Sequence, residues 1–120
     1  MKQTVVFDFD GVIHSYTSGW FGPSIIPDPP VPGVKEAIDS IRAAGYEVVV
    51  VSTRCASIDG LYAIKNYLEK HNIIVDNIQR EKPPALVYID DRAICFDGDS
   101  ASLLNKIQHF QPWYKIGGHK

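Results

Sequence analysis

Three short runs of apolar residues recur along the chain, and polar residues follow each run directly. The runs are continuous rather than alternating, and they are rich in β-branched residues. This pattern is typical of strands that are buried on both faces of a parallel sheet. We therefore predict parallel strands at residues 5–7, 48–51 and 86–89.

Apolar residues between and after these runs recur at the spacing of amphipathic helices. The pattern predicts helices over residues 34–44, 61–68 and 103–110. Ser57 is a suitable N-cap for the second helix, and Asn72 a suitable terminator.

Two further segments, 73–75 and 93–96, are weaker strand candidates. The resulting order of strands and helices is that of an α/β protein, in which right-handed crossovers place helices on both faces of a parallel sheet. We predict a three-layer Rossmann-like fold. Residues 1–114 are expected to form one domain, and residues 115–120 a flexible tail.

Residues 14–33 fit neither pattern and are expected to form a long loop. This loop contains five of the eight prolines of the chain. Loops of more than about 12–15 residues in a compact domain are usually functional or disordered, and the aromatic residues Trp20 and Phe21 argue against disorder. We expect a functional loop whose aromatic residues help to exclude water or anchor the loop to the core.

Composition narrows the class of protein. The 120 residues are 45% hydrophobic and 22% charged, which argues against disordered and fibrous proteins. A net charge of −2 gives no overall attraction to nucleic acid or to an anionic membrane, so a phosphate must be held locally. The N-terminal apolar stretch is too short for a signal peptide or membrane span, and the two cysteines have no metal-ligand spacing. These features predict a cytoplasmic protein.

Acidic residues gather where the predicted strands end. Asp8 and Asp10 are two positions apart, so extended backbone projects both to the same side. Asp90 and Asp91 follow another predicted strand, and the carboxyl ends of parallel strands share one edge of the sheet. Crowded carboxylates repel one another unless a cation neutralises them, and carboxylate oxygens suit Mg²⁺. We therefore predict a Mg²⁺ site.

The segment 8–12, read as Asp-Phe-Asp-Gly-Val, belongs to a larger pattern with Ser52, Lys82 and the pair Asp90 and Asp91. In order and spacing these residues resemble the four motifs of the haloacid dehalogenase (HAD) superfamily of phosphohydrolases. The gaps between the motifs leave no room for the cap domain of larger members, so the chain resembles a small capless type.

The resemblance implies a phosphatase that works through an aspartyl-phosphate. Asp8 would be the nucleophile, and Asp10 the general acid and then the general base. Ser52 would bind a phosphoryl oxygen, and Lys82 would balance the charge of the transferred group. The dehalogenases of this superfamily generally lack a second aspartate two positions after the nucleophile, so Asp10 favours a phosphatase over a dehalogenase.

The resemblance also implies which other residues contact the ligands. The metal ligands would be Asp8, the backbone carbonyl of Asp10, and one or both of Asp90 and Asp91. The backbone around Thr53 and Arg54 would add donors to the substrate. Independently of the resemblance, we expect Gly11 and the aromatic side chain of Trp20 to contact substrate.

Several alternatives stay open. Arg54 could instead pair with a surface carboxylate, Lys82 could be a solvated loop residue, and His14 could be an exposed loop residue or a substrate contact. A non-catalytic phosphate-binding or phospho-receiver domain could have the same fold, although a receiver needs no acid or base at Asp10. The expected partner is a phosphorylated substrate, either a small molecule or the end of a macromolecule. Nucleic acid is expected only as a substrate, no membrane is expected, and a second copy of the chain could serve as a cap.

Overall fold

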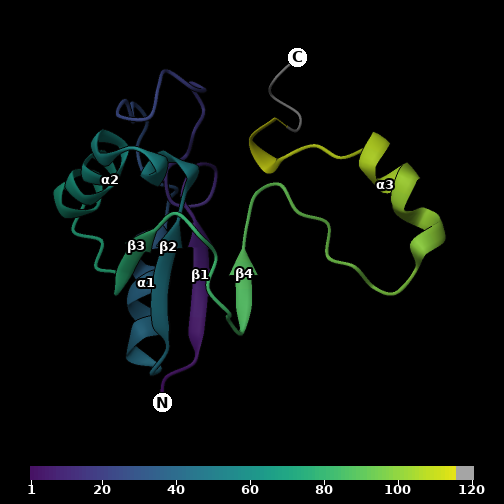
Figure 1. Ribbon diagram of the computed structural model, residues 1–120, viewed down its shortest axis with the longest axis horizontal. Helices are drawn as coiled ribbons and strands as arrows, with labels where there is room; N and C mark the ends of the chain where they lie inside the picture. The colour runs from purple at the N-terminus through teal and green to yellow at the C-terminus, as the bar shows by residue number, and fades with distance from the viewer. Residues whose placement is uncertain (116–120) are drawn as a thin grey trace.

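The computed structural model describes residues 1–115, and the centre of the molecule is a four-stranded parallel sheet (Figure 1). The order of the strands across the sheet is β3-β2-β1-β4. Residues 116–120, most of the predicted tail, lie outside the described residues, and Lys115 ends a short 3₁₀ turn. The strands are β1 (Thr4–Asp8), β2 (Glu47–Val51), β3 (Asn77–Gln79) and β4 (Val87–Ile89).

Strand β1 lies between β2 and β4 and fixes the register of both. Phe7 is paired with Val50 on one side and with Ile89 on the other. Because all pairs are parallel, the residues that follow the strands emerge at the same edge of the sheet. The fold thereby brings the polar ends of distant strands together.

Two of the three helices cover one face of the sheet. The helices are α1 (Val34–Ala43), α2 (Ile58–Lys70) and α3 (Leu103–Gln108). The buried residues of α1 and α2 join those of β1 and β2 in the main core, whereas α3 lies beyond β4 (Figure 1). The opposite face of the sheet has a smaller buried cluster of Val6, Val49 and Val51, against which Ala85 packs. The main core contains Val5, Phe7, Phe9, Ile13, Val34, Ile38, Val48, Val50, Ile64, Tyr67, Leu68 and Ile73.

The predicted Rossmann-like α/β fold is confirmed. Of the helices expected on both faces, α1 and α2 cover one face and α3 lies beyond β4, so no helix of the described residues covers the opposite face. Two strand predictions are wrong. Residues 73–75 are not a strand, because Ile73 instead donates its N–H to Leu68 in the turn that closes α2 and packs into the core. The strand of this part of the chain is β3, which begins two residues later, at Asn77. Residues 93–96 are also outside the sheet, because the chain turns away after β4.

The helix predictions are correct in place and differ at the ends. Ser57 caps α2, accepting a hydrogen bond from the backbone N–H of Gly60 at 3.0 Å. Asn72 stands just beyond the helix in a left-handed conformation (φ 58°), as expected of a terminator. Helix α3 ends at Gln108 rather than at residue 110. None of the helices within residues 1–115 has the length and apolar character needed to cross a bilayer.

Two isoleucines of α2 test the main core. Ile64 is 0% exposed, and Ile58 is 70% exposed on the same helix. We expect Ile64→Ala to lower the free energy of unfolding by about 2–5 kcal/mol, because it removes buried methyl groups and leaves a cavity. We expect Ile58→Ala to change it by about 0.5 kcal/mol or less. Urea unfolding of both variants measures the difference, and equal losses would contradict this description of the core.

Candidate active site

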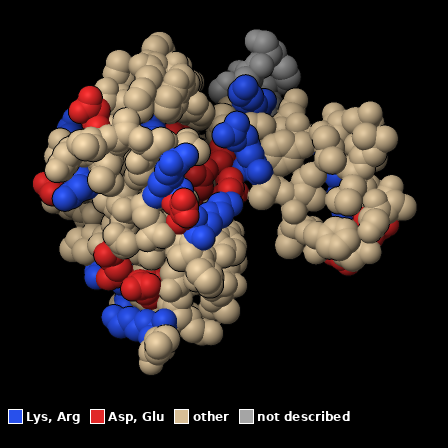
Figure 2. Space-filling model, in the orientation of Figure 1, with Lys and Arg blue, Asp and Glu red and all other residues tan. Residues whose placement is uncertain are grey.

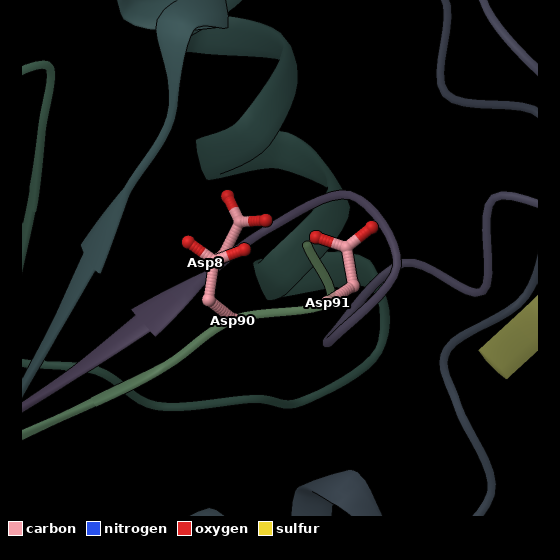
Figure 3. Close-up of side chains that lie close together, drawn as sticks. All are labelled: Asp8, Asp90 and Asp91. Atoms are coloured by element: carbon pink, nitrogen blue, oxygen red, sulfur yellow. The ribbon is translucent and has the colours of Figure 1, made fainter. Parts of the chain in front are cut away.

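Three aspartates meet at the carboxyl ends of β1 and β4. Asp8 is the last residue of β1, and Asp90 and Asp91 follow β4 directly. One carboxylate oxygen from each residue lies within 4.8 Å of the other two. Figure 3 shows the three side chains gathered at the end of β1. The predicted meeting of these residues is thus present, and the three carboxylates could hold a metal ion.

The electrostatics of this cluster favour a cation. Burial, a hydrogen bond with Asp91 and the negative charges of Asp90 and Asp91 raise the pKa of Asp8 to about 8. Asp91 accepts a hydrogen bond from the Tyr114 hydroxyl through Oδ2 at 2.9 Å. Its other oxygen, Oδ1, is buried and has no hydrogen-bond partner among residues 1–115. A buried carboxylate oxygen without a donor is costly, and a divalent cation would satisfy it.

The Asp10 side chain lies outside the cluster of three and has different partners. Its carboxylate accepts hydrogen bonds from Arg54 Nε at 2.9 Å and Arg54 Nη2 at 3.0 Å, and it contacts His14 Nδ1 at 2.8 Å. Burial opposes ionisation, but the hydrogen bonds from His14 and Arg54 and the charge of Arg54 outweigh it and hold the pKa of Asp10 below its usual value. Asp10 is therefore ionised. The metal contact expected from its backbone carbonyl stays a prediction.

His14 is fully buried, so its interpretation as an exposed loop residue is wrong. Its Nε2 lies 3.1 Å from the backbone N–H of Asp28, which can only donate. A neutral imidazole that accepts at Nε2 carries its proton on Nδ1, so we assign the Nδ1–H as the donor to Asp10. The ring packs against Phe9 and Tyr67. His14 thus connects the loop to the second aspartate.

Arg54 also binds the loop of residues 14–33, through the Nη1 group that does not contact Asp10. The side chain is 1% exposed, and Nη1 donates to the backbone carbonyls of Gly22, Pro23 and Ile25 at 2.9–3.2 Å. The Trp20 ring lies over the guanidinium, 4.6 Å away. Arg54 thus pairs with a carboxylate, but this is Asp10 of the site and not the surface carboxylate of the alternative. A direct contact between Arg54 and substrate stays a prediction.

A cavity of about 550 Å³, which we call the aspartate cavity, opens above the three carboxylates. Ser52 is buried there, and its hydroxyl oxygen accepts the backbone N–H of Arg54 at 3.1 Å. Lys82 is half exposed, with Nζ 3.5 Å from Asp90. Figure 2 shows basic side chains bordering the acidic centre. The lining residues are Asp8, Asp10, Tyr16, Trp20, Val51, Ser52, Thr53, Arg80, Lys82, Asp90, Asp91 and Arg92.

Gly11 serves close packing behind this cavity. Its φ is +82°, and a Cβ at this position would overlap the Asp91 carboxylate and come within 2.8 Å of the Tyr114 ring. Its carbonyl accepts a hydrogen bond from Trp113 Nε1 at 2.6 Å. Only glycine satisfies both the backbone conformation and the close approach. A substrate contact at Gly11 stays a prediction.

Trp113 and Tyr114, which were not predicted from the sequence, reach the site from the C-terminal segment. Tyr114 is buried and bonds Asp91, while Trp113 bonds the Gly11 carbonyl. The signal was a pair of aromatic residues directly after Pro112, at the end of the last helical pattern. Arg80 and Arg92 were also missed as members of the basic border.

Comparison with known proteins gives structural neighbours only. No protein-family model matches the sequence, and no curated protein matches it significantly. Two neighbours are chains from structures of a Pnkp1/Rnl/Hen1 RNA repair complex, with TM-scores of 0.56 and 0.51 and 16% identity in both cases. They match 94% and 92% of this chain, which spans only 36% and 33% of their own length. A protein from Vibrio cholerae is similar at 26% identity and a TM-score of 0.55, over 78% of this chain and 83% of its own. These neighbours support the α/β fold.

The raised pKa of Asp8 predicts how stability changes with pH. Between its ordinary value of 3.8 and its folded value of about 8, the folded chain binds a proton at Asp8 that the unfolded chain has released. Stability without a divalent cation should therefore fall as the pH rises from about 5 to about 8. Mg²⁺ should raise the melting temperature more at pH 8 than at pH 5, because it binds the ionised carboxylate.

Thermal unfolding with EDTA and with Mg²⁺ across this range measures both effects, and Asp8→Asn is the control. The substitution removes the titrating group, so both trends should be weaker in this variant. The same pH dependence in Asp8→Asn and in the original protein would contradict the interpretation.

Proposed function

We propose that this protein is a Mg²⁺-dependent phosphatase of the HAD type, which hydrolyses a phosphomonoester through an aspartyl-phosphate on Asp8. The observation that carries the proposal is the meeting of Asp8, Asp90 and Asp91 beneath a cavity with a basic border. A separate, ionised Asp10 lies two residues from the proposed nucleophile. This geometry suits Asp8 as the nucleophile and Asp10 as the general acid and base.

The proposed metal site is built by Asp8, Asp90 and Asp91. The unsatisfied Oδ1 of Asp91 and the raised pKa of Asp8 both fit a cation at this point. Bound Mg²⁺ would keep Asp8 ionised and screen its charge from an approaching phosphate. Tyr114 holds the other oxygen of Asp91 and so orients that carboxylate.

The first chemical step is attack by an Asp8 oxygen on phosphorus, in line with the ester oxygen. The new bond joins Asp8 to phosphorus, and the bond to the leaving oxygen breaks. Ser52 can donate its hydroxyl proton to a phosphoryl oxygen, because the hydroxyl oxygen itself accepts from Arg54. Lys82, at the border of the cavity, balances negative charge on the transferred group.

The second step is attack by water on the phosphorus of the aspartyl-phosphate. Asp10 takes the proton of this water, inorganic phosphate leaves, and the Asp8 carboxylate is restored. The ionised state of Asp10 suits this role as a base. To protonate the leaving oxygen in the first step, Asp10 must bind a proton against the hydrogen bonds from His14 and Arg54. Its help should therefore matter least for leaving groups that need no proton.

The class of substrate is proposed only as a phosphomonoester, small or at the end of a macromolecule. Two structural neighbours are chains of a Pnkp1/Rnl/Hen1 complex, described in one case as an RNA repair complex, and this supports a phosphorylated nucleic-acid end as a candidate substrate for this chain. Hydrolysis of a generic aryl phosphate, with Mg²⁺ and with EDTA, tests the proposed activity. Turnover that needs Mg²⁺ supports it. Binding of phosphate without turnover would favour the receiver or binding domain instead.

The nucleophile is tested by Asp8→Asn. The amide has the shape of the carboxylate but cannot attack phosphorus, so we expect activity to fall by about 10⁴-fold or more, with the fold retained. Asp39→Asn is a matched control, because Asp39 lies on α1 and pairs only with Lys35 among the described residues. Activity of Asp8→Asn within tenfold of the original would refute the assignment.

The acid and base role is tested by Asp10→Asn with an activated aryl phosphate. We expect turnover to fall by about 10²–10⁴-fold. Breakdown of the aspartyl-phosphate should slow more than its formation, so phosphate attached to Asp8 should accumulate. Rapid quenching followed by mass spectrometry measures the modified fraction. Unimpaired turnover with no added mass at Asp8 would contradict the mechanism.

A further inference from the structure

A second cavity of about 490 Å³ lies beside the aspartate cavity. It is formed between residues 16–20 of the loop and residues 110–115 of the C-terminal segment, and we call it the aromatic cavity. Tyr16, Trp20 and Arg92 line both cavities. A ligand whose phosphate occupies the first cavity can therefore extend directly into the second.

The C-terminal wall of the aromatic cavity is fixed to Gly11 and Asp91 at the candidate active site. Trp113 bonds the Gly11 carbonyl at 2.6 Å, and Tyr114 bonds Asp91 at 2.9 Å. The Tyr114 ring also meets the Tyr16 ring edge to face, with centroids 5.8 Å apart. These contacts hold the C-terminal wall at a set distance from the three aspartates. The aromatic cavity thus adjoins the aspartate cavity, and hydrogen bonds to residues of the site hold its wall in place.

The lining of the aromatic cavity has a definite chemistry. It combines four aromatic rings with two cations, and no carboxylate residue is among its lining residues within the described chain. Aromatic rings offer stacking surfaces to a flat ring of a ligand, and cations attract a negative group beside it. The six residues are Tyr16, Trp20, Phe110, Tyr114, Arg92 and Lys115.

We propose that the aromatic cavity binds the base of a nucleoside phosphate whose phosphate lies over Asp8, an inference that rests on the proposed function. A sugar phosphate offers no flat aromatic ring to stack on Trp20 or Phe110. Phosphotyrosine carries its phosphate on the ring and has no spacer to span the two cavities. A nucleoside phosphate has a flat base separated from its phosphate by a sugar, and this length suits two adjoining cavities.

The test is calorimetric binding with Mg²⁺ to the full chain carrying Asp8→Asn, which does not consume the ligand. The probes are adenosine 3′-phosphate, adenosine 5′-phosphate, ribose 5-phosphate, phosphotyrosine and inorganic phosphate. We expect at least one nucleotide to bind about tenfold or more tightly than ribose 5-phosphate, because a stacked base contributes on this order.

Phe110→Leu keeps apolar bulk and removes the ring, and Phe110→Ala removes both. In each variant the preference for the nucleotide should fall to about twofold, while inorganic phosphate binds as before. Leu104→Ala is the control, because Leu104 is an exposed residue of α3 that does not line the cavity. It should leave all affinities unchanged. Melting curves verify that each variant is folded.

The outcomes separate the two proposals. Nucleotide and ribose phosphate binding equally, an unaltered preference in Phe110→Leu, or phosphotyrosine binding as tightly as the nucleotide would each overturn the base site while leaving the phosphatase proposal standing. Binding of none of the phosphates would overturn both. Nucleotide binding that depends on Phe110, without any binding of inorganic phosphate, would support the cavity and refute the phosphate site at Asp8.

Discussion

The parallel pairing of β1 with β4 is the constraint on which the rest of the site depends. Phe7 and Ile89 are register partners, so the chain places Asp8 and Asp90 side by side one position later. Asp91 follows, and three carboxylates then share a space less than 5 Å across. Mutual repulsion and burial make this arrangement costly without a cation. A cation bound at this edge of the sheet would therefore stabilise the fold.

Asp8 and Asp10 are separated by one residue, but their pKa values are shifted in opposite directions. Burial and neighbouring carboxylates raise the pKa of Asp8, while Arg54 and His14 lower that of Asp10. Phe9 between them is fully buried. Neighbouring groups whose surroundings push their pKa values apart are the usual basis for distinct acid and base roles. Here the loop of residues 14–33 contributes to the difference, because it is tied to the same Arg54 side chain.

Much of this arrangement could be predicted from the sequence, because it follows from local pattern and from the rule that parallel strands share their carboxyl edge. That rule was enough to bring Asp8 and Asp90 together. The burial of His14 and Arg54 could not be predicted in the same way, since it depends on how a proline-rich loop without periodicity folds back. The contact of Tyr114 with Asp91 joins residues 23 positions apart, and the chain on either side of the short helix α3 between them has no repeating pattern. The strand at 77–79 was predicted at 73–75 instead, because Ile73 and its neighbours have the composition of a strand although they close a helix.

The central claim is that phosphate passes through Asp8 on its way to water. The stereochemistry of hydrolysis tests this most directly, with a phosphomonoester made chiral at phosphorus by oxygen isotopes. Each in-line displacement inverts the phosphorus centre, so two successive displacements predict retention of configuration in the phosphomonoester that forms when an acceptor alcohol takes the place of water. Inversion would mean that the acceptor attacks the substrate directly, and it would contradict an aspartyl-phosphate.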